Sequence, residues 1–163
     1  PILLIAGHNL LDTVHVQDNK VVSFLWSILH EFNYFQFGPL KLYVVYPVIP
    51  WIGLMTLGYW FGNLYTTDIP KDTRKKRLLS YGFTGILAFI GLRFLNIYGD
   101  PFPWSKQSSP LFTFLSFLNT NKYPPSLLFI LITLPPTLVA LALTENIRGG
   151  LSKILITFGR VPL

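Results

Sequence analysis

The sequence predicts an all-α fold, a polytopic transmembrane helical bundle, from its composition, its long uncharged stretches and the positions of its basic residues. Of the 163 residues, 51% are hydrophobic and 12% are charged, which is about half the charged share of a soluble domain. The mean hydropathy is +0.48. In water such a chain would expose too much apolar surface, so we expect the lipid bilayer to be its main partner.

Three full spans are expected, over residues 43–65, 78–99 and 123–144. The first and third carry no charged side chain, and the second carries only Arg93; about 20 apolar residues cross a bilayer. Pro135 and Pro136 remove two backbone donors, so the third span should bend or break there. Residues 1–11 and 151–163 are interpreted as partial spans. We therefore expect one transmembrane domain over residues 1–163, cut at both ends from a longer chain.

Two shorter apolar stretches are predicted to be helices lying at the membrane surface. Each places its apolar residues on one helical face; these are Phe24, Leu25, Ile28, Leu29 and Phe32 in the first stretch, and Leu111, Phe114, Leu115 and Leu118 in the second. Helices buried in a cap outside the membrane are the alternative.

The basic residues predict the orientation of the spans. Residues 66–77 and 144–153 carry seven Lys and Arg, whereas residues 12–43 and 99–123 carry four over a much longer length. Because cytoplasmic loops are enriched in Lys and Arg, the first two segments are expected in the cytoplasm and the other two outside it. The net charge of +6 comes largely from residues 71–77. A basic cluster beside a span suits lipid headgroups, so we expect no nucleic-acid partner.

Candidate catalytic residues lie at the end of the first partial span. His8 and Asp12 are four positions apart, which places them on one helical face. A carboxylate beside an imidazole raises its basicity, as a general base requires. The alternative is that both residues cap the helix end. The chain has no cysteine and no His-rich ligand spacing, so no metal site is predicted.

Candidate binding residues surround the end of the second span. Arg93 lies inside an apolar stretch, where a cation is costly and faces the protein interior. It could contact an anionic substrate or cofactor, pair with Asp100 or Asp12, or extend toward the headgroups. Asn96 and Asp100 belong to a rigid turn that is either a sugar-binding edge or an ordinary interfacial turn. Lys122 either anchors at headgroups or reaches the same site.

Five blocks of the sequence carry a resemblance to a known family. They are GHNLLD, YPVIPWIGLMTLGYWFGNLY, LRFLNIYGDPFPW, SFLNTNKYPPSLLFILITLPP and FGRVPL. In this order they resemble bacterial integral membrane proteins related to the catalytic domain of heparan-alpha-glucosaminide N-acetyltransferase, within the transmembrane acyltransferase superfamily. The similarity extends over essentially the whole chain, and the PWIG and KYPPS blocks are the most specific.

The resemblance implies transfer of an acetyl group across a bacterial cytoplasmic membrane. Acetyl-CoA in the cytoplasm would be the donor, an extracytoplasmic amino sugar or related molecule the acceptor, and a histidine the central catalytic group. The family's own histidine segment precedes the blocks found here, so the resemblance assigns no role to His8. Two other functions stay open. One is a non-enzymatic subunit or scaffold of a larger membrane complex, and the other is a transporter or channel, for which a broken helix is typical.

Overall fold

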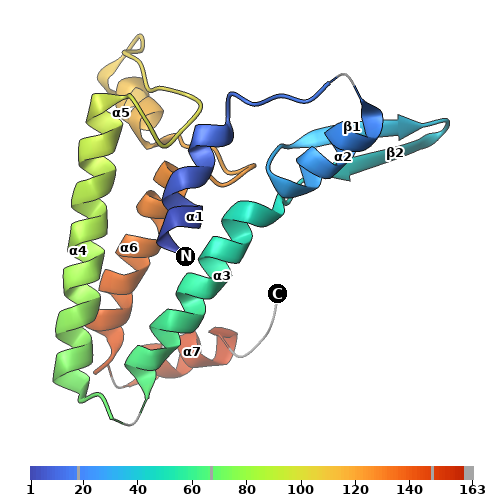
Figure 1. Ribbon diagram of the computed structural model, residues 1–163. Coiled ribbons are helices and arrows are strands. Elements are labelled where there is room, and N and C mark those ends of the chain that lie inside the picture. The colour runs from blue at the N-terminus through green and yellow to red at the C-terminus, as the bar shows by residue number, and fades with distance from the viewer. Residues whose placement is uncertain (18, 67, 148, 160–163) are drawn as a thin grey trace.

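The computed structural model describes residues 1–17, 19–66, 68–147 and 149–159. The chain is mostly helical, with one small antiparallel sheet (Figure 1). Its elements in order are α1 (Ile2–Gly7), the 3₁₀ turn η1 (His8–Leu11), α2 (Lys20–Leu29), β1 (Asn33–Phe37), β2 (Leu40–Val44), α3 (Val48–Gly62), the 3₁₀ turn η2 (Asn63–Tyr65), α4 (Lys71–Leu95), α5 (Pro110–Leu118), α6 (Leu127–Thr144) and α7 (Gly150–Gly159).

The antiparallel pair of α4 and α6 is the most extensive helix contact of the fold. Two glycines of α4 allow the close approach. A Cβ at Gly85 would lie 2.8 Å from the Cβ of Pro135, and a Cβ at Gly82 would lie 2.9 Å from the Pro135 carbonyl oxygen. Small residues let helix backbones approach closely, as at helix contacts within membranes. Among the described residues, α4 and α6 are the two helices long and apolar enough to cross a bilayer.

Helix α6 is continuous through Pro135 and Pro136, so it is not broken there; the bend that was the other expected outcome stays a prediction. The ring of Pro135 occupies the space that the α4 glycines leave open. Neighbouring hydroxyls reinforce the backbone on either side, because Thr133 donates to the Phe129 carbonyl at 2.7 Å and Thr137 donates to the Thr133 carbonyl at 2.8 Å. Threonine hydroxyls of this kind help a membrane helix to tolerate proline.

Helix α1 packs against α3, which is shorter than the expected 43–65 span. A Cβ at Gly53 of α3 would lie 3.0 Å from side-chain atoms of both Leu4 and Ile5, so this glycine is needed for the contact. Helix α3 begins only after Pro47, because proline disfavours helical geometry in the residue before it. It ends at Gly62 and continues as the turn η2.

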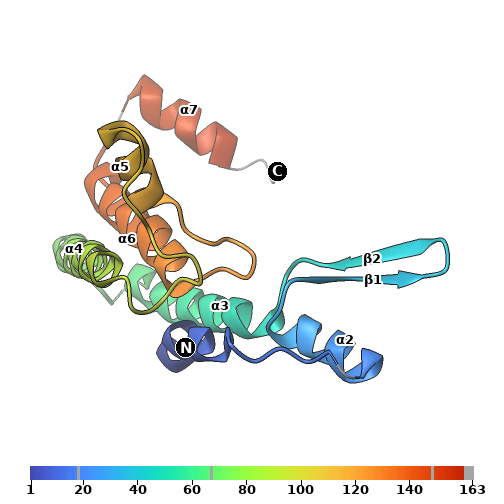
Figure 2. The same cartoon turned by 90° about the horizontal axis from the view of Figure 1, so that it is seen from above.

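The residues ahead of α3 form a β-hairpin, which corrects the all-α prediction. Strand β1 pairs with β2 from Asn33 opposite Val44 to Phe37 opposite Leu40, and Gly38 takes the left-handed conformation in the two-residue turn (φ +59°). The hairpin lies beside α2 and projects away from the α4–α6 pair in both views (Figures 1 and 2). A Gly-containing turn between two aromatic-rich runs is a hairpin signal that lies within the predicted 12–43 loop.

Helix α2 turns its serines inward and most of its aliphatic residues outward, and α5 buries none of its residues. Ser23 and Ser27 are the buried residues of α2, whereas Val21, Leu25 and Leu29 are exposed. In α5, Leu111 is among the exposed apolar residues, and none of its residues is buried. This arrangement is the reverse of that in a helix packed on a water-soluble core.

The basic residues of 71–77 form the first two turns of α4 rather than a loop, which corrects the expected 66–77 loop. At this end Arg74 forms an ion pair with Glu145, which follows α6, and its guanidinium lies 4.9 Å from the ring centre of Tyr65. This pair joins the ends of α3, α4 and α6. The segments 12–43 and 99–123 lie at the opposite end of the helices (Figure 1).

Candidate functional site

The turn from α1 into η1 directs three polar side chains toward the start of α6. His8 and Asn9 are buried, and Asp12 is half-buried. The Asn9 side chain links two parts of the chain, since its Oδ1 accepts from the Leu127 backbone amide at 2.9 Å and its Nδ2 donates to Asp12 Oδ2 at 2.7 Å. Asn9 therefore fixes Asp12 relative to the N-terminus of α6.

A second histidine, which the sequence reasoning missed, completes this group. His30 follows α2, and only 2% of it is exposed. Its Nε2 lies 3.1 Å from Asp12 Oδ1, across a separation of 18 residues. The sequence carries one signal for His30: it lies in the segment 12–43, which is expected on the same side of the membrane as His8 and Asp12.

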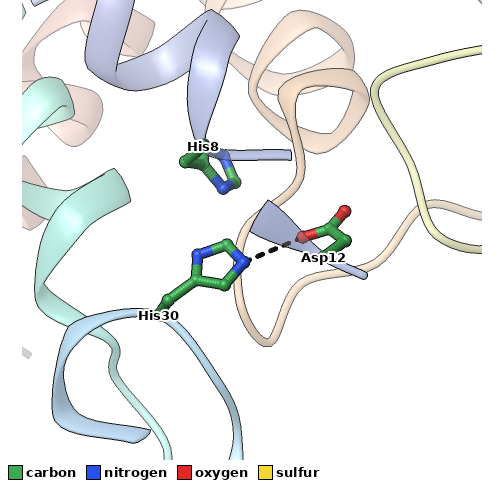
Figure 3. A group of neighbouring side chains, drawn as sticks. All are labelled: His8, Asp12 and His30. Atoms are coloured by element: carbon green, nitrogen blue, oxygen red, sulfur yellow. Dashed lines mark hydrogen bonds and ion pairs between the residues drawn. The ribbon is translucent and has the colours of Figure 1, made fainter. Parts of the chain in front are cut away.

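His8, Asp12 and His30 point toward one another (Figure 3). The two imidazole ring centres are 5.7 Å apart. One nitrogen or oxygen atom from each of the three residues lies within 4.8 Å of those from the other two. His8 does not bond to Asp12 as expected from their spacing, because the chain changes from an α-helix to a 3₁₀ turn at His8.

A pocket of about 190 Å³ opens beside this group. Asp12 and His30 line it together with other residues from four segments of the chain; the others are Asn9, Val14, His15, Glu31, Phe32, Pro101, Asn121, Tyr123 and Pro124. His15 Nδ1 and Glu31 Oε1 form a pair at its rim, 2.7 Å apart. The pocket thus combines two carboxylates and two imidazoles with amide and apolar groups.

Arg93 points into the protein but does not pair with Asp100 or Asp12. Its guanidinium donates to the backbone carbonyls of Phe117 at 2.9 Å, Phe102 at 3.0 Å and Ser116 at 3.1 Å, and also to that of Asn119. Only 1% of the residue is exposed. These bonds give Arg93 a structural role in holding the segment after α4, and a substrate contact by Arg93 stays a prediction.

The two polar residues of the predicted turn also hold the backbone. Asn96 has φ +57°; its side chain donates to the Trp104 carbonyl at 2.8 Å and accepts from the Trp104 amide at 3.0 Å. Asp100 accepts from the Asn121 amide and the Ser126 hydroxyl, both at 2.7 Å. Asp100 therefore holds the loop whose residues Asn121 and Tyr123 form the pocket wall.

Lys122 is exposed and lies 5.1 Å from the ring centre of Tyr123. It is not among the pocket-lining residues. Of the six residues predicted for the site, the structure brings His8 and Asp12 together and places Asp100 behind the pocket wall. Arg93 and Asn96 bind backbone groups instead, and Lys122 faces outward.

A comparison with protein families matches residues 2–99 to the model described as heparan-alpha-glucosaminide N-acetyltransferase, catalytic. The match spans more than half of the chain and contains all three residues of the buried group. No curated protein and no solved structure matches the chain. The chain therefore belongs to the family of the heparan-alpha-glucosaminide N-acetyltransferase catalytic domain.

Proposed function

We propose that this chain is part of an integral membrane acetyltransferase. It would pass an acetyl group from cytoplasmic acetyl-CoA to an amino sugar or a related acceptor on the other side of a bacterial cytoplasmic membrane. The observation that carries the proposal is the buried His–Asp group that opens on a pocket, in a chain of this family. Fold and family do not determine the acceptor, so the acceptor is proposed from the family alone.

The dimensions of the helices support a membrane location. At about 1.5 Å per residue, α4 is about 37 Å long and α6 about 27 Å, against a hydrocarbon core of about 30 Å. Only 22% of the most apolar 18-residue stretch of α4 is buried within the chain, and only 28% of that of α6. Helix α3 with η2 reaches about 28 Å, which supports a third span. A core helix of a soluble protein would be mostly buried, so these surfaces suit lipid or further membrane helices.

The short helices and the basic end support the orientation. The outward apolar faces of α2 and α5 would rest in the interface on the side of the pocket. The basic turns of α4 lie at the other end (Figure 1) and would face the cytoplasm. Under this orientation the pocket opens outside the cytoplasm, on the side where the acceptor is expected.

The pocket offers the groups that acetyl transfer needs from this chain. In the transfer step the acceptor nitrogen forms a bond to the acetyl carbonyl carbon, and the bond from that carbon to the CoA sulfur breaks. The acceptor nitrogen then loses a proton. His30, oriented by Asp12 at 3.1 Å, would receive this proton, and the leaving thiolate would later be protonated. Apolar and amide groups of the wall would hold the acceptor.

Acetyl transfer by the full-length protein in proteoliposomes tests the proposal. Acetyl-CoA is supplied on the side of the α4 basic turns and a panel of amino sugars on the other side. Asp12→Asn and His30→Gln should lower the rate about 100-fold or more, as for loss of general-base catalysis. Asp72→Asn, which changes an exposed carboxylate at the far end of α4, is the matched control and should retain the rate.

Two outcomes would contradict the proposal. A wild-type rate in the Asp12 and His30 variants would show that this pocket is not the site of transfer. If the folded wild-type protein transfers no acetyl group to any acceptor, a scaffold role in a larger complex becomes the better explanation.

A further inference from the structure

His8 lacks the hydrogen bonds that a buried imidazole requires. Only 2% of the residue is exposed, and within the described part of the chain neither ring nitrogen has a hydrogen-bond partner. The Pro125 carbonyl lies near the ring but outside standard hydrogen-bond geometry. Leaving a buried polar group unpaired costs about 1–3 kcal/mol, so a group that satisfies these nitrogens would stabilise the site.

The same deficit extends to His30. Its Nε2 faces Asp12 Oδ1, whereas its Nδ1 is buried and unpaired among the described residues. Both histidines turn nitrogen atoms toward the space between the rings (Figure 3). Two imidazoles and one carboxylate around a shared point form a donor set for a cation rather than for an anion.

We propose that His8, Asp12 and His30 form a binding site for a divalent transition-metal ion, best suited to Zn²⁺. Two histidines and one carboxylate are a common ligand set of catalytic zinc sites. Zinc–nitrogen bonds of about 2.1 Å in tetrahedral geometry separate ligand atoms by about 3.4 Å. The Asp12–His30 pair already lies at 3.1 Å, and all three ligand atoms lie within 4.8 Å, so the widest pair must approach by about 1.4 Å.

The surroundings of the three residues resemble the outer shell of a metal site. Asn9 Nδ2 donates to Asp12 Oδ2 at 2.7 Å, which leaves Oδ1 as the ligand oxygen and fixes the carboxylate. Such partners hold metal ligands in place.

One side of the site faces the pocket, since Asp12 and His30 also line it. A zinc ion here has three protein ligands and a fourth position for water or an acceptor group, as catalytic zinc sites do. This inference goes beyond acetyl transfer, because the ion would bind whether or not the protein transfers acetyl groups. If it is bound during transfer, Asp12 and His30 act as its ligands, and His30 no longer serves as the proton acceptor.

Metal binding by the full-length protein, purified in detergent and stripped with chelator, tests the inference without an activity assay. Calorimetric titration with ZnCl₂ should show a site that weakens about 100-fold or more in His8→Gln, His30→Gln and Asp12→Asn, because each removes a ligand. His15→Gln is the matched control: His15 is exposed at the pocket rim and bonded to Glu31. Its zinc affinity should equal that of the wild type.

Two further readouts keep the test decisive where a variant is unstable. Zn²⁺ should raise the Tm of the wild type and of His15→Gln but not that of Asp12→Asn, which preserves side-chain shape. Co²⁺ should give the visible absorption of a tetrahedral site with nitrogen and oxygen ligands in the wild type. Wild-type protein that binds no zinc, or variants of all three residues that bind it as the wild type does, would overturn the inference.

Discussion

Replacing Arg93 with methionine should destabilise the segment between α4 and α6. Arg93 is buried near the end of α4, and its guanidinium binds four backbone carbonyls of this segment. One carbonyl lies before α5, two lie within α5 and one lies just after it. Methionine keeps most of the apolar stem but has no donor. The variant therefore leaves those four carbonyls without their partner and keeps most of the packing.

The structure sets the size of the expected effect. A hydrogen bond to a charged group contributes about 1.5–3 kcal/mol, but the desolvation of the guanidinium offsets part of this gain. Removing one partner from a buried charged network costs about 3–5 kcal/mol, and we expect a loss of this order in the free energy of unfolding. The bond from the Trp104 indole to the Arg93 carbonyl, 2.8 Å long, is made by the backbone and should survive.

Urea or thermal unfolding of the full-length protein in detergent measures this loss, and limited proteolysis reports opening of residues 96–126. Arg77→Met is the matched control, because Arg77 is exposed on the same helix and its replacement should change stability by less than about 0.5 kcal/mol. Arg93→Lys keeps the charge but lacks the planar fork, so its stability should fall between those of the methionine variant and the wild type.

Unchanged stability and proteolysis of Arg93→Met would refute the structural role. If that stable variant also failed to transfer acetyl groups, the predicted contact between Arg93 and an anionic substrate would become the better explanation. Stability and transfer together therefore distinguish the two roles of Arg93.

The remaining predictions concern helix packing and topology. Gly85→Leu should separate α4 from α6, because even its Cβ would lie 2.8 Å from that of Pro135; we expect a loss of about 1–3 kcal/mol, measured by thermal unfolding. Gly91→Ala on the same helix meets open space, so comparable destabilisation there would contradict the packing argument. Cysteines introduced as Lys75→Cys and Ser108→Cys, in a background without others, should react with impermeant reagents from opposite sides, the first from the cytoplasm. Labelling of Ser108→Cys from the cytoplasm alone would reverse the proposed topology.

The two long helices could be predicted because their signal is local. An apolar stretch interrupted only by Arg93 makes up most of α4, and an uncharged stretch of about 20 residues contains α6; burial against a partner is not needed to recognise them. The continuity of α6 was not predicted, because it depends on glycines of another helix that accommodate Pro135. The hairpin was not predicted although its turn contains Gly38, because its two strands are only five residues long and show no strict alternation of apolar and polar side chains.

The site was only half predicted, because its central contact joins distant residues. His8 and Asp12 were found from their spacing, yet the bond that the structure shows is between Asp12 and His30, 18 positions away. The periodicity of a helix does not bring residues 18 positions apart into contact. This contact depends on how the chain runs from η1 through α2. The roles of Asn96 and Asp100 were also beyond sequence reasoning, since their partners are backbone groups of loops whose course the sequence does not specify.

The polar residues at the pocket end of the helices form two sets with different roles. The N-terminal part of the chain supplies the groups with chemistry, namely His8, Asp12 and His30. The polar residues after α4 bind backbone instead and shape the opposite wall: Asp100 holds the Asn121 amide at 2.7 Å, and Asn121 lines the pocket. Asn9 joins the sets, because it bonds both Asp12 and the first amide of α6. The wall and the reactive groups are thus fixed relative to each other by side chains that need not touch a substrate, as preorganised sites require.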